Sequence, residues 1–209
     1  MIGFALALAL AAAPEGYADT ELARFGPGIP GSIAIMRRTG RDGRDFGTTT
    51  TVVQRIEHPE TELTRMLVRY RNVQGAQPLV SAVWEYTLRP ELIEWSKLDS
   101  NREPAIQLHT PLQPGTRWTY HFGTGEVRSE IVAIEPVAVP AGTYQGALHV
   151  RASATLHDGK EALESVNDFW YVRDVGLVKW VAYSTRDGNP ALMDELVSFK
   201  RDPVPTRRP

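Results

Sequence analysis

The chain has 209 residues, enough for one β domain with a substantial core or for two small ones that share an interface. Apolar residues make up 42% and charged residues 23%, which argues against disorder, and the formal net charge of −2 gives no basic excess to attract nucleic acid or anionic membrane. The sequence has no cysteine, which excludes disulfides, thiolate metal sites and a lipid-modified cysteine anchor within it. We therefore expect no nucleic-acid partner and no stable membrane anchor.

The N-terminal residues have the composition of an export signal. Residues 2–13 are an apolar run, shorter than the roughly 20 residues that a helix needs to span a bilayer. The small-residue pattern Gly16-Tyr17-Ala18 follows, so we predict a signal peptide over 1–18 with cleavage after Ala18. No Lys or Arg precedes the run, and a buried N-terminal strand or helix is the alternative. A cleaved signal predicts a periplasmic or secreted protein.

The first half reads as hairpins after an extended lead-in, because five Gly or Pro residues interrupt residues 17–31. β-Branched residues crowd 48–57, and apolar and polar residues alternate with period two over 62–73. Good helix formers at 62–66 leave a helix as the alternative there, although the alternation favours a strand. The predicted strands of this half are 32–38, 48–57, 62–73, 79–88 and 91–98.

Prolines at 104, 111 and 114 predict a connection over 104–115 that divides one domain, 19–200, into subregions 19–103 and 104–200. Turn residues at 123–125, 141–142, 158–159, 174–176 and 187–190 separate the strands of the second half. These strands are predicted at 118–122, 126–135, 147–157, 165–173, 177–186 and 192–200. The tail 201–209, with three prolines and three arginines, is predicted to be disordered.

About a dozen short strands with regular turn signals and no long amphipathic helix predict an all-β fold, mainly antiparallel. We expect a twisted, curved sheet that forms a half-barrel or barrel-like structure, or folds over itself.

No catalytic motif is present, and the histidines do not predict a metal site. His149 and His157 share a strand face but lie eight residues apart, roughly 27 Å along a strand, so they cannot share a metal ion. Because His149 lies on the face opposite Leu148 and Val150, we expect it to be exposed to solvent. We predict no metal, no cofactor and no catalytic residues.

The aromatic residues are the strongest indication of a binding function. All five tryptophans fall inside predicted strands, and a curved sheet lined by large apolar side chains could enclose an apolar ligand. A well-packed core has the same composition and is the alternative. The tentative ligand-binding residues are Trp84, Trp118, Tyr120, Trp170 and Trp180.

Three motifs mark the second half: Pro114-Gly115-Thr116-Arg117-Trp118, Val139-Pro140-Ala141-Gly142-Thr143-Tyr144, and Trp170-Tyr171 followed by Val175-Gly176-Leu177-Val178-Lys179. Together they resemble the motifs of a group of largely uncharacterised bacterial extracytoplasmic β domains. The resemblance covers about residues 110–182 and implies an exported β domain, loosely similar to the half-barrels of periplasmic lipoprotein carriers. It implies core positions for the aromatic residues and tight bends at the glycines. It brings no catalytic residues.

These observations favour an exported, non-enzymatic β protein that acts by binding in the cell envelope. The partner is then an apolar small molecule or an envelope protein. A carrier of a lipid or other apolar ligand is the alternative, and an envelope hydrolase or metal-dependent enzyme is the second one. A histidine and carboxylates within hydrogen-bonding reach of each other in a cleft would favour the enzyme.

Overall fold

The computed structural model describes residues 20–28, 31–60, 63–74, 77–98, 103–122, 125–158 and 161–201, except for the side chains of 54–81, 122 and 156–162. The predicted signal peptide and residues 202–209 of the predicted tail lie outside these ranges. No helix within them is long and apolar enough to cross a lipid bilayer.

The described residues form twelve strands and one short 3-10 helix, η1 (Ala23–Phe25). The strands of the first half are β1 (Ser32–Gly40), β2 (Asp45–Glu60), β3 (Leu63–Gln74), β4 (Gln77–Leu88), β5 (Leu92–Lys97) and β6 (Ala105–His109). Those of the second half are β7 (Arg117–Phe122), β8 (Gly125–Val139), β9 (Gly142–Asp158), β10 (Glu161–Val172), β11 (Gly176–Tyr183) and β12 (Pro190–Arg201).

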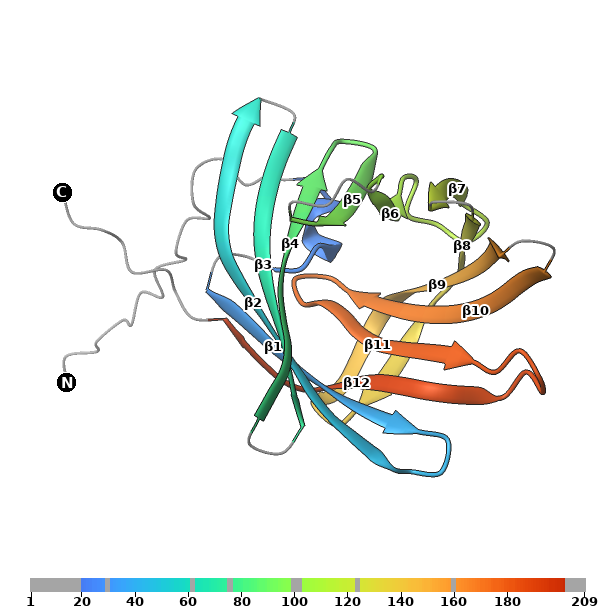
Figure 1. Ribbon diagram of the computed structural model, residues 1–209. Helices are drawn as coiled ribbons and strands as arrows, with labels where there is room; N and C mark the ends of the chain where they lie inside the picture. Colours follow the sequence, from blue (N-terminus) through green and yellow to red (C-terminus); the bar gives the residue numbers. More distant parts are fainter. Residues whose placement is uncertain are drawn as a thin grey trace, which may run out of the picture.

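All twelve strands belong to one sheet in the order β6-β5-β4-β3-β2-β1-β12-β11-β10-β9-β8-β7 (Figure 1). Each half is an antiparallel meander, and the pairing of β1 with β12 joins the two halves. The predicted all-β fold with about a dozen strands is confirmed. The backbone of β3 also confirms a strand rather than a helix near 62–73, while its predicted faces fall outside the described side chains.

Strand β6 lies inside the stretch that the sequence predicts as a connection, 104–115, so that prediction is wrong for residues 105–109. It is a short edge strand between Pro104 and Pro111, positions where a missing N–H costs no ladder bond. The other edge is β7. No ladder joins β6 to β7 in the described residues, and the sheet does not close. The indole of Trp118 on β7 donates to the carbonyl oxygen of Ile106 on β6 (3.1 Å).

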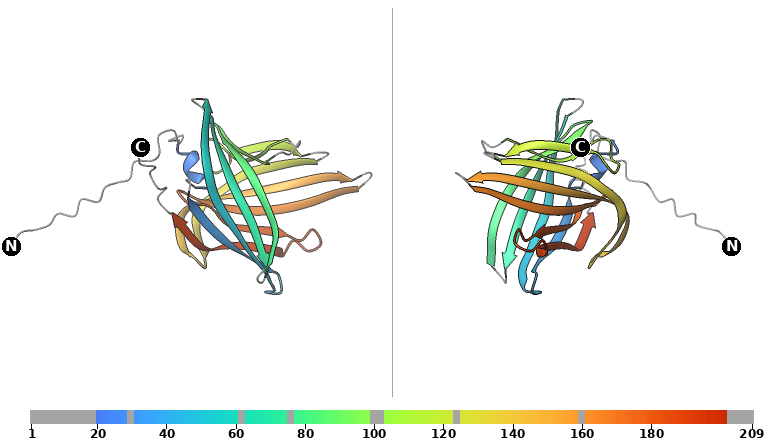
Figure 2. Two further views of the ribbon diagram at one scale, coloured as in Figure 1. Left: turned by 60° about the vertical axis from the view of Figure 1, so that its left-hand side comes forward. Right: turned by 90° about the vertical axis from the view of Figure 1, so that its right-hand side faces the viewer.

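The sheet curls so that its two halves face each other, as the views in Figure 2 show. Buried side chains from both halves meet in a first core. We call the face of the sheet that points toward this core the inner face. The members of this core are Leu22, Ala23, Phe25, Val53, Tyr86, Leu88, Ile93, Leu108, Trp118, Ile131, Leu148, Val150 and Tyr171. The members that lie on strands come from β2 and from β4 to β10, and period-two alternation directs one face of these strands toward the core.

The segment around η1 lies against this core and is tied to the turn between β10 and β11. The Asp174 amide donates to the Arg24 carbonyl (2.6 Å), and the Arg24 Nε donates to the Asp174 carboxylate (2.9 Å). Gly176 has φ +89°, and a Cβ at this position would lie 2.6 Å from the carbonyl oxygen of Gly26. Only glycine therefore allows the two segments to approach so closely.

A second core forms where the far end of the β8–β9 hairpin bends across β12. The Ala141 amide donates to the Leu196 carbonyl (2.9 Å). The buried members are Met36, Val137, Ala147, Val172, Val178 and Leu196, with Tyr144 and Trp170 packed against them. The bend follows two register shifts in the β8–β9 ladder, one on each side of Glu135. Bulges of this kind increase local twist and redirect a strand.

Candidate ligand-binding site on the inner face

A pocket of about 330 Å³ opens on the inner face, between the two halves of the sheet. Strands β4 and β5 contribute Trp84 and Trp95, whose rings are tilted at 59° with centroids 4.6 Å apart. From the other half, β10 contributes Phe169 and Tyr171, whose rings stack at 6.2 Å. The remaining lining residues are Arg38, Thr49, Ala82, Tyr86, Gln107, Leu177 and Asp194.

The charged residues of this pocket form one bidentate ion pair between the central strands β1 and β12. Arg38 donates from Nε and Nη2 to the two carboxylate oxygens of Asp194, at 2.8 and 2.7 Å. The Asp194 side chain is 13% exposed, and the hydrogen bond to Asp194 raises the pKa of Arg38. The Arg38 guanidinium also lies 5.0 Å from the centroid of the Trp180 ring. Arginine stacked on an aromatic face is weakly hydrated, which suits it to a partly dry site.

The five aromatic residues predicted to bind a ligand do not all gather at this pocket. Trp84 is part of its lining. Trp118 is buried in the first core, and Tyr120 packs against that core, where burial raises the pKa of its hydroxyl. Trp180 adjoins the pocket through Arg38, and its indole donates to Asn167 (3.0 Å). Trp170 packs against the second core. A ligand-binding role for these residues stays a prediction.

The sequence analysis left out four aromatic residues of this lining, namely Tyr86, Trp95, Phe169 and Tyr171. Trp95 pairs with Tyr86 across the β4–β5 ladder, so it shares the inner face with Trp84 and Tyr86. The Arg89-Pro90 interruption between two predicted strands was the available signal, because a hairpin there fixes this register.

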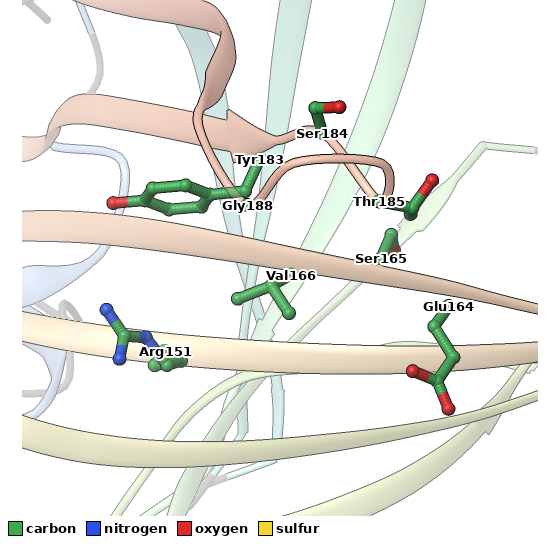
Figure 3. A pocket seen from close by; sticks show the side chains of 8 residues that line it. All are labelled: Arg151, Glu164, Ser165, Val166, Tyr183, Ser184, Thr185 and Gly188. Atoms are coloured by element: carbon green, nitrogen blue, oxygen red, sulfur yellow. The ribbon is translucent and has the colours of Figure 1, made fainter.

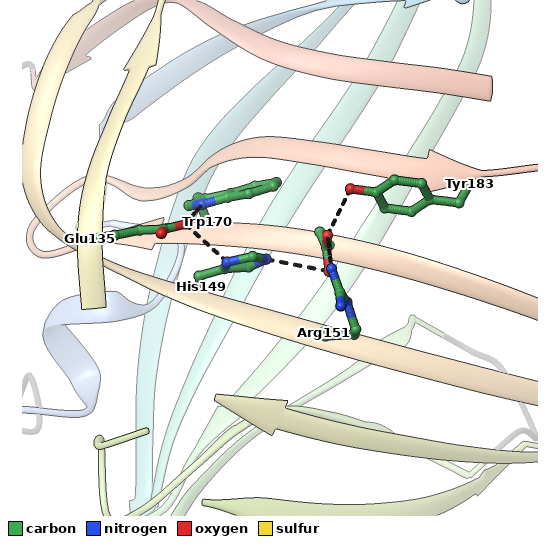
Figure 4. Close-up of polar contacts among 6 residues, drawn as sticks. Glu135, His149, Arg151, Trp170 and Tyr183 are labelled. Carbon is green, nitrogen blue, oxygen red and sulfur yellow. Dashed lines mark hydrogen bonds and ion pairs between the residues drawn. The ribbon is translucent and has the colours of Figure 1, made fainter. Parts of the chain in front are cut away.

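On the outer face of β9 and β10, opposite the first core, polar side chains form a connected cluster (Figure 4). His149 lies between two carboxylates, with Nδ1 2.9 Å from Glu135 Oε1 and Nε2 3.3 Å from Asp168 Oδ1. The imidazole stacks on Trp170 with centroids 4.3 Å apart. The expectation of a solvent-exposed His149 is wrong, since its side chain is only 13% exposed. Bent β8 brings Glu135 over this face, which a single-strand pattern cannot reveal.

Asp168 is the buried centre of this cluster, at 1% exposure. Arg151 donates to both of its oxygens at 2.8 Å, and the Tyr183 hydroxyl donates to Oδ2 at 2.8 Å. Burial acts to raise the pKa of Asp168, but the contacts with His149, Arg151 and Tyr183 lower it by more than burial raises it. The pKa of Asp168 therefore lies well below the usual value. His149 Nε2 is near Asp168 without hydrogen-bond geometry and has no hydrogen-bond partner among the described residues.

A second pocket, of about 380 Å³, begins at Arg151 and Tyr183 and extends along β10 to Glu164 (Figure 3). The turn after β11 covers it with Ser184, Thr185 and Gly188, and Ser165 and Val166 complete the lining. His149 and Asp168 are not part of this lining. Within the described ranges, no group of three or more histidine, aspartate or glutamate side chains could hold a metal ion.

Solved structures of other proteins share the fold of this chain. A protein from Bacteroides fragilis, described as exported and as having a YmcC-like fold, aligns with a TM-score of 0.65 at 17% identity, over 85% of this chain and 99% of that one. A protein from Parabacteroides distasonis, described as a lipoprotein, aligns with a TM-score of 0.63 at 13% identity, over 87% of this chain and 100% of that one. No family model matches the sequence, and no curated protein matches it.

At these identities the likeness shows the fold alone. It agrees with the predicted resemblance to extracytoplasmic β domains at that level. The three sequence motifs are consistent with the structure in their backbone roles, because Gly115, Gly142 and Gly176 all have positive φ, at +89°, +140° and +89°. Trp118 is buried in the first core, as the resemblance implies.

Proposed function

We propose that the protein acts outside the cytoplasm by binding an apolar small molecule in the inner-face pocket. The observation that carries this proposal is the set of aromatic side chains from both halves of the sheet that line one pocket. The descriptions of the two structural neighbours as an exported protein and a lipoprotein support the predicted periplasmic or secreted location.

The size of the pocket is that of a ligand site. The pocket of about 330 Å³ opens to solvent and falls at the lower end of the range for sites that bind small molecules. An apolar cavity of about 150 Å³ is already large enough to bind benzene. A pocket of this volume with an aromatic lining therefore favours an apolar ligand.

The outer-face cluster contains the residue types of an enzyme, but its geometry supports catalysis less well. Both nitrogens of His149 face carboxylates, so neither is directed at a hydroxyl that it could deprotonate. Asp168 accepts hydrogen bonds from Arg151 and Tyr183, an arrangement typical of an ion pair that stabilises the fold. Among the side chains that the structure describes, the exposed large apolar residues Phe46, Ile134 and Leu163 lie on three different strands, β2, β8 and β10, which favours a small molecule over an envelope protein as partner.

Native mass spectrometry with lipid extraction on protein purified from the envelope tests the proposal. We expect an apolar molecule at near-stoichiometric occupancy. The Ala82→Phe variant fills the pocket from a small lining residue and should lose this molecule, whereas Ala138→Phe, at an exposed position of β8, should retain it. A clean protein mass together with no binding of a ten-carbon alcohol, ether, carboxylate or amine would refute the proposed function.

A further inference from the structure

We propose that the inner-face pocket selects uncharged amphiphiles with a hydrogen-bond donor, such as alcohols or amides, over fatty acids and alkylamines. This inference rests on the proposed function and specifies the chemistry of its ligand. It follows from three properties of the lining, namely its volume, its charge balance and one acceptor without a partner.

The volume limits the enclosed part of the ligand. Because a water-sized group occupies about 30 Å³, the pocket of about 330 Å³ holds roughly eleven non-hydrogen atoms. That suits one short alkyl chain or a compact ring system and is too small to enclose a two-chain lipid. Trp84 and Trp95 on one side and Phe169 on the other provide broad apolar surfaces for such a body.

The charges in the pocket cancel. Arg38 and Asp194 are its charged lining residues among those described, and they neutralise each other through two hydrogen bonds. A ligand carboxylate in the pocket would be attracted by Arg38 but repelled by Asp194. A ligand ammonium group would be attracted by Asp194 but repelled by Arg38. Removing an ionic head group from water without a free countercharge is unfavourable, so the pocket disfavours ligands of either sign.

The acceptor without a partner is Gln107 on β6. Its side chain lines the pocket, and its Oε1 atom is buried and makes no hydrogen bond within the described residues, so the side-chain amide has to turn for this atom to reach a ligand. A buried acceptor left unpaired is costly, so a ligand that donates an O–H or N–H group to it gains an interaction that an ether or an alkane cannot make. Sites of this type reject analogues that lack the donor.

Calorimetric titration of the full chain with four probes of similar chain length, at neutral pH, tests the inference. The probes are 1-decanol, its methyl ether, decanoate and decylammonium. We expect decanol to bind at least tenfold more tightly than each of the other three. Equal or tighter binding of decanoate, decylammonium or the ether would overturn the inference and leave the proposed function intact. Failure of all four would instead count against the proposed function.

Variants separate the two parts of the inference. Gln107→Leu should remove the preference for decanol over the ether, because the acceptor is gone. Asp194→Asn leaves the guanidinium uncompensated and should raise the affinity for decanoate relative to decanol at least tenfold. Arg38→Gln should do the same for decylammonium.

The double variant Arg38→Gln/Asp194→Asn restores neutrality and controls for damage to the fold. We expect it to recover the wild-type order of the probes. Unchanged selectivity in folded single variants would overturn the role of charge balance. Unchanged discrimination against the ether in Gln107→Leu would overturn the role of the acceptor.

Discussion

Substitution of Gly176 by alanine tests how firmly the η1 segment is held against the first core. A Cβ at this position would lie 2.6 Å from the Gly26 carbonyl oxygen and 3.4 Å from the Pro27 Cα, so the segment has to move. Gly115 has the same φ of +89° with nothing within 4 Å of its Cβ site, which makes Gly115→Ala a matched control for backbone strain alone.

The expected magnitudes follow from two terms. Left-handed backbone costs an alanine about 1–2 kcal/mol, and both variants carry this cost. Leu22 and Phe25 are 2% and 5% exposed, and full burial of such a side chain contributes about 1.5–3 kcal/mol. If displacement exposes half of each, Gly176→Ala loses roughly 2 kcal/mol more than Gly115→Ala.

The assay is urea unfolding followed by tryptophan fluorescence, with the slope checked for two-state behaviour. Limited proteolysis should also cleave near residues 20–28 faster in Gly176→Ala than in Gly115→Ala. Equal losses of stability in the two variants would show that the segment contributes little and that the close approach to Gly26 carries no stabilisation.

Three further predictions concern the pH dependence and the packing of the sheet. Contacts hold the pKa of Asp168 below its unfolded value of about 3.9, so the carboxylate stabilises the fold above that pH, and this contribution is lost as the pH falls through the folded-state pKa. Asp168→Asn should therefore cost about 2–3 kcal/mol of stability at pH 7, and the midpoint of urea unfolding should fall less steeply below pH 4 in the variant than in the wild type. Trp118→Phe should cost about 1 kcal/mol in the same assay through the lost indole hydrogen bond to β6, and Trp118→Ala about 3–5 kcal/mol; a neutral phenylalanine variant would show that this bond is not needed. Leu196→Ala should lower stability by about 2–5 kcal/mol and Leu163→Ala by less than about 0.5 kcal/mol, because the first side chain is 0% exposed and the second 55%; similar losses would contradict the described second core.

Most of the strand pattern follows from the sequence because period-two alternation and turn residues are local signals. The Asp174-Val175-Gly176 turn is one example, since both Asp174 and Gly176 adopt positive φ there. Strand β6 escapes such reasoning because it is short and lies between prolines, and its strand conformation depends on pairing with β5. Local propensity is weak in so short a segment, and the neighbouring strand decides.

The candidate site is less accessible to sequence reasoning. Alternation shows which residues of one strand share a face, but the curvature of the whole sheet decides which aromatic residues converge. Trp84 and Trp95 meet at one pocket, whereas Trp170 packs against the second core. The burial of His149 likewise depends on the bend of β8, which follows from register shifts that need both strands of the ladder.

The pairing of β1 with β12 has a consequence for how the molecule assembles. Every other neighbouring pair in the sheet is a hairpin or a short connection, so each meander can form from contacts that are close along the chain. The β1–β12 ladder instead joins Ser32–Gly40 to residues up to Arg201 and has to wait for the last strand. Such non-local pairing is slow, because closure of the long intervening loop precedes the contacts that reward it. Until then β1 and β11 are bare strand edges, the surfaces through which β proteins aggregate. A chain that ends before β12 should therefore leave two meanders that are not joined and that associate with other copies, and the yield of soluble protein should depend on the integrity of β12.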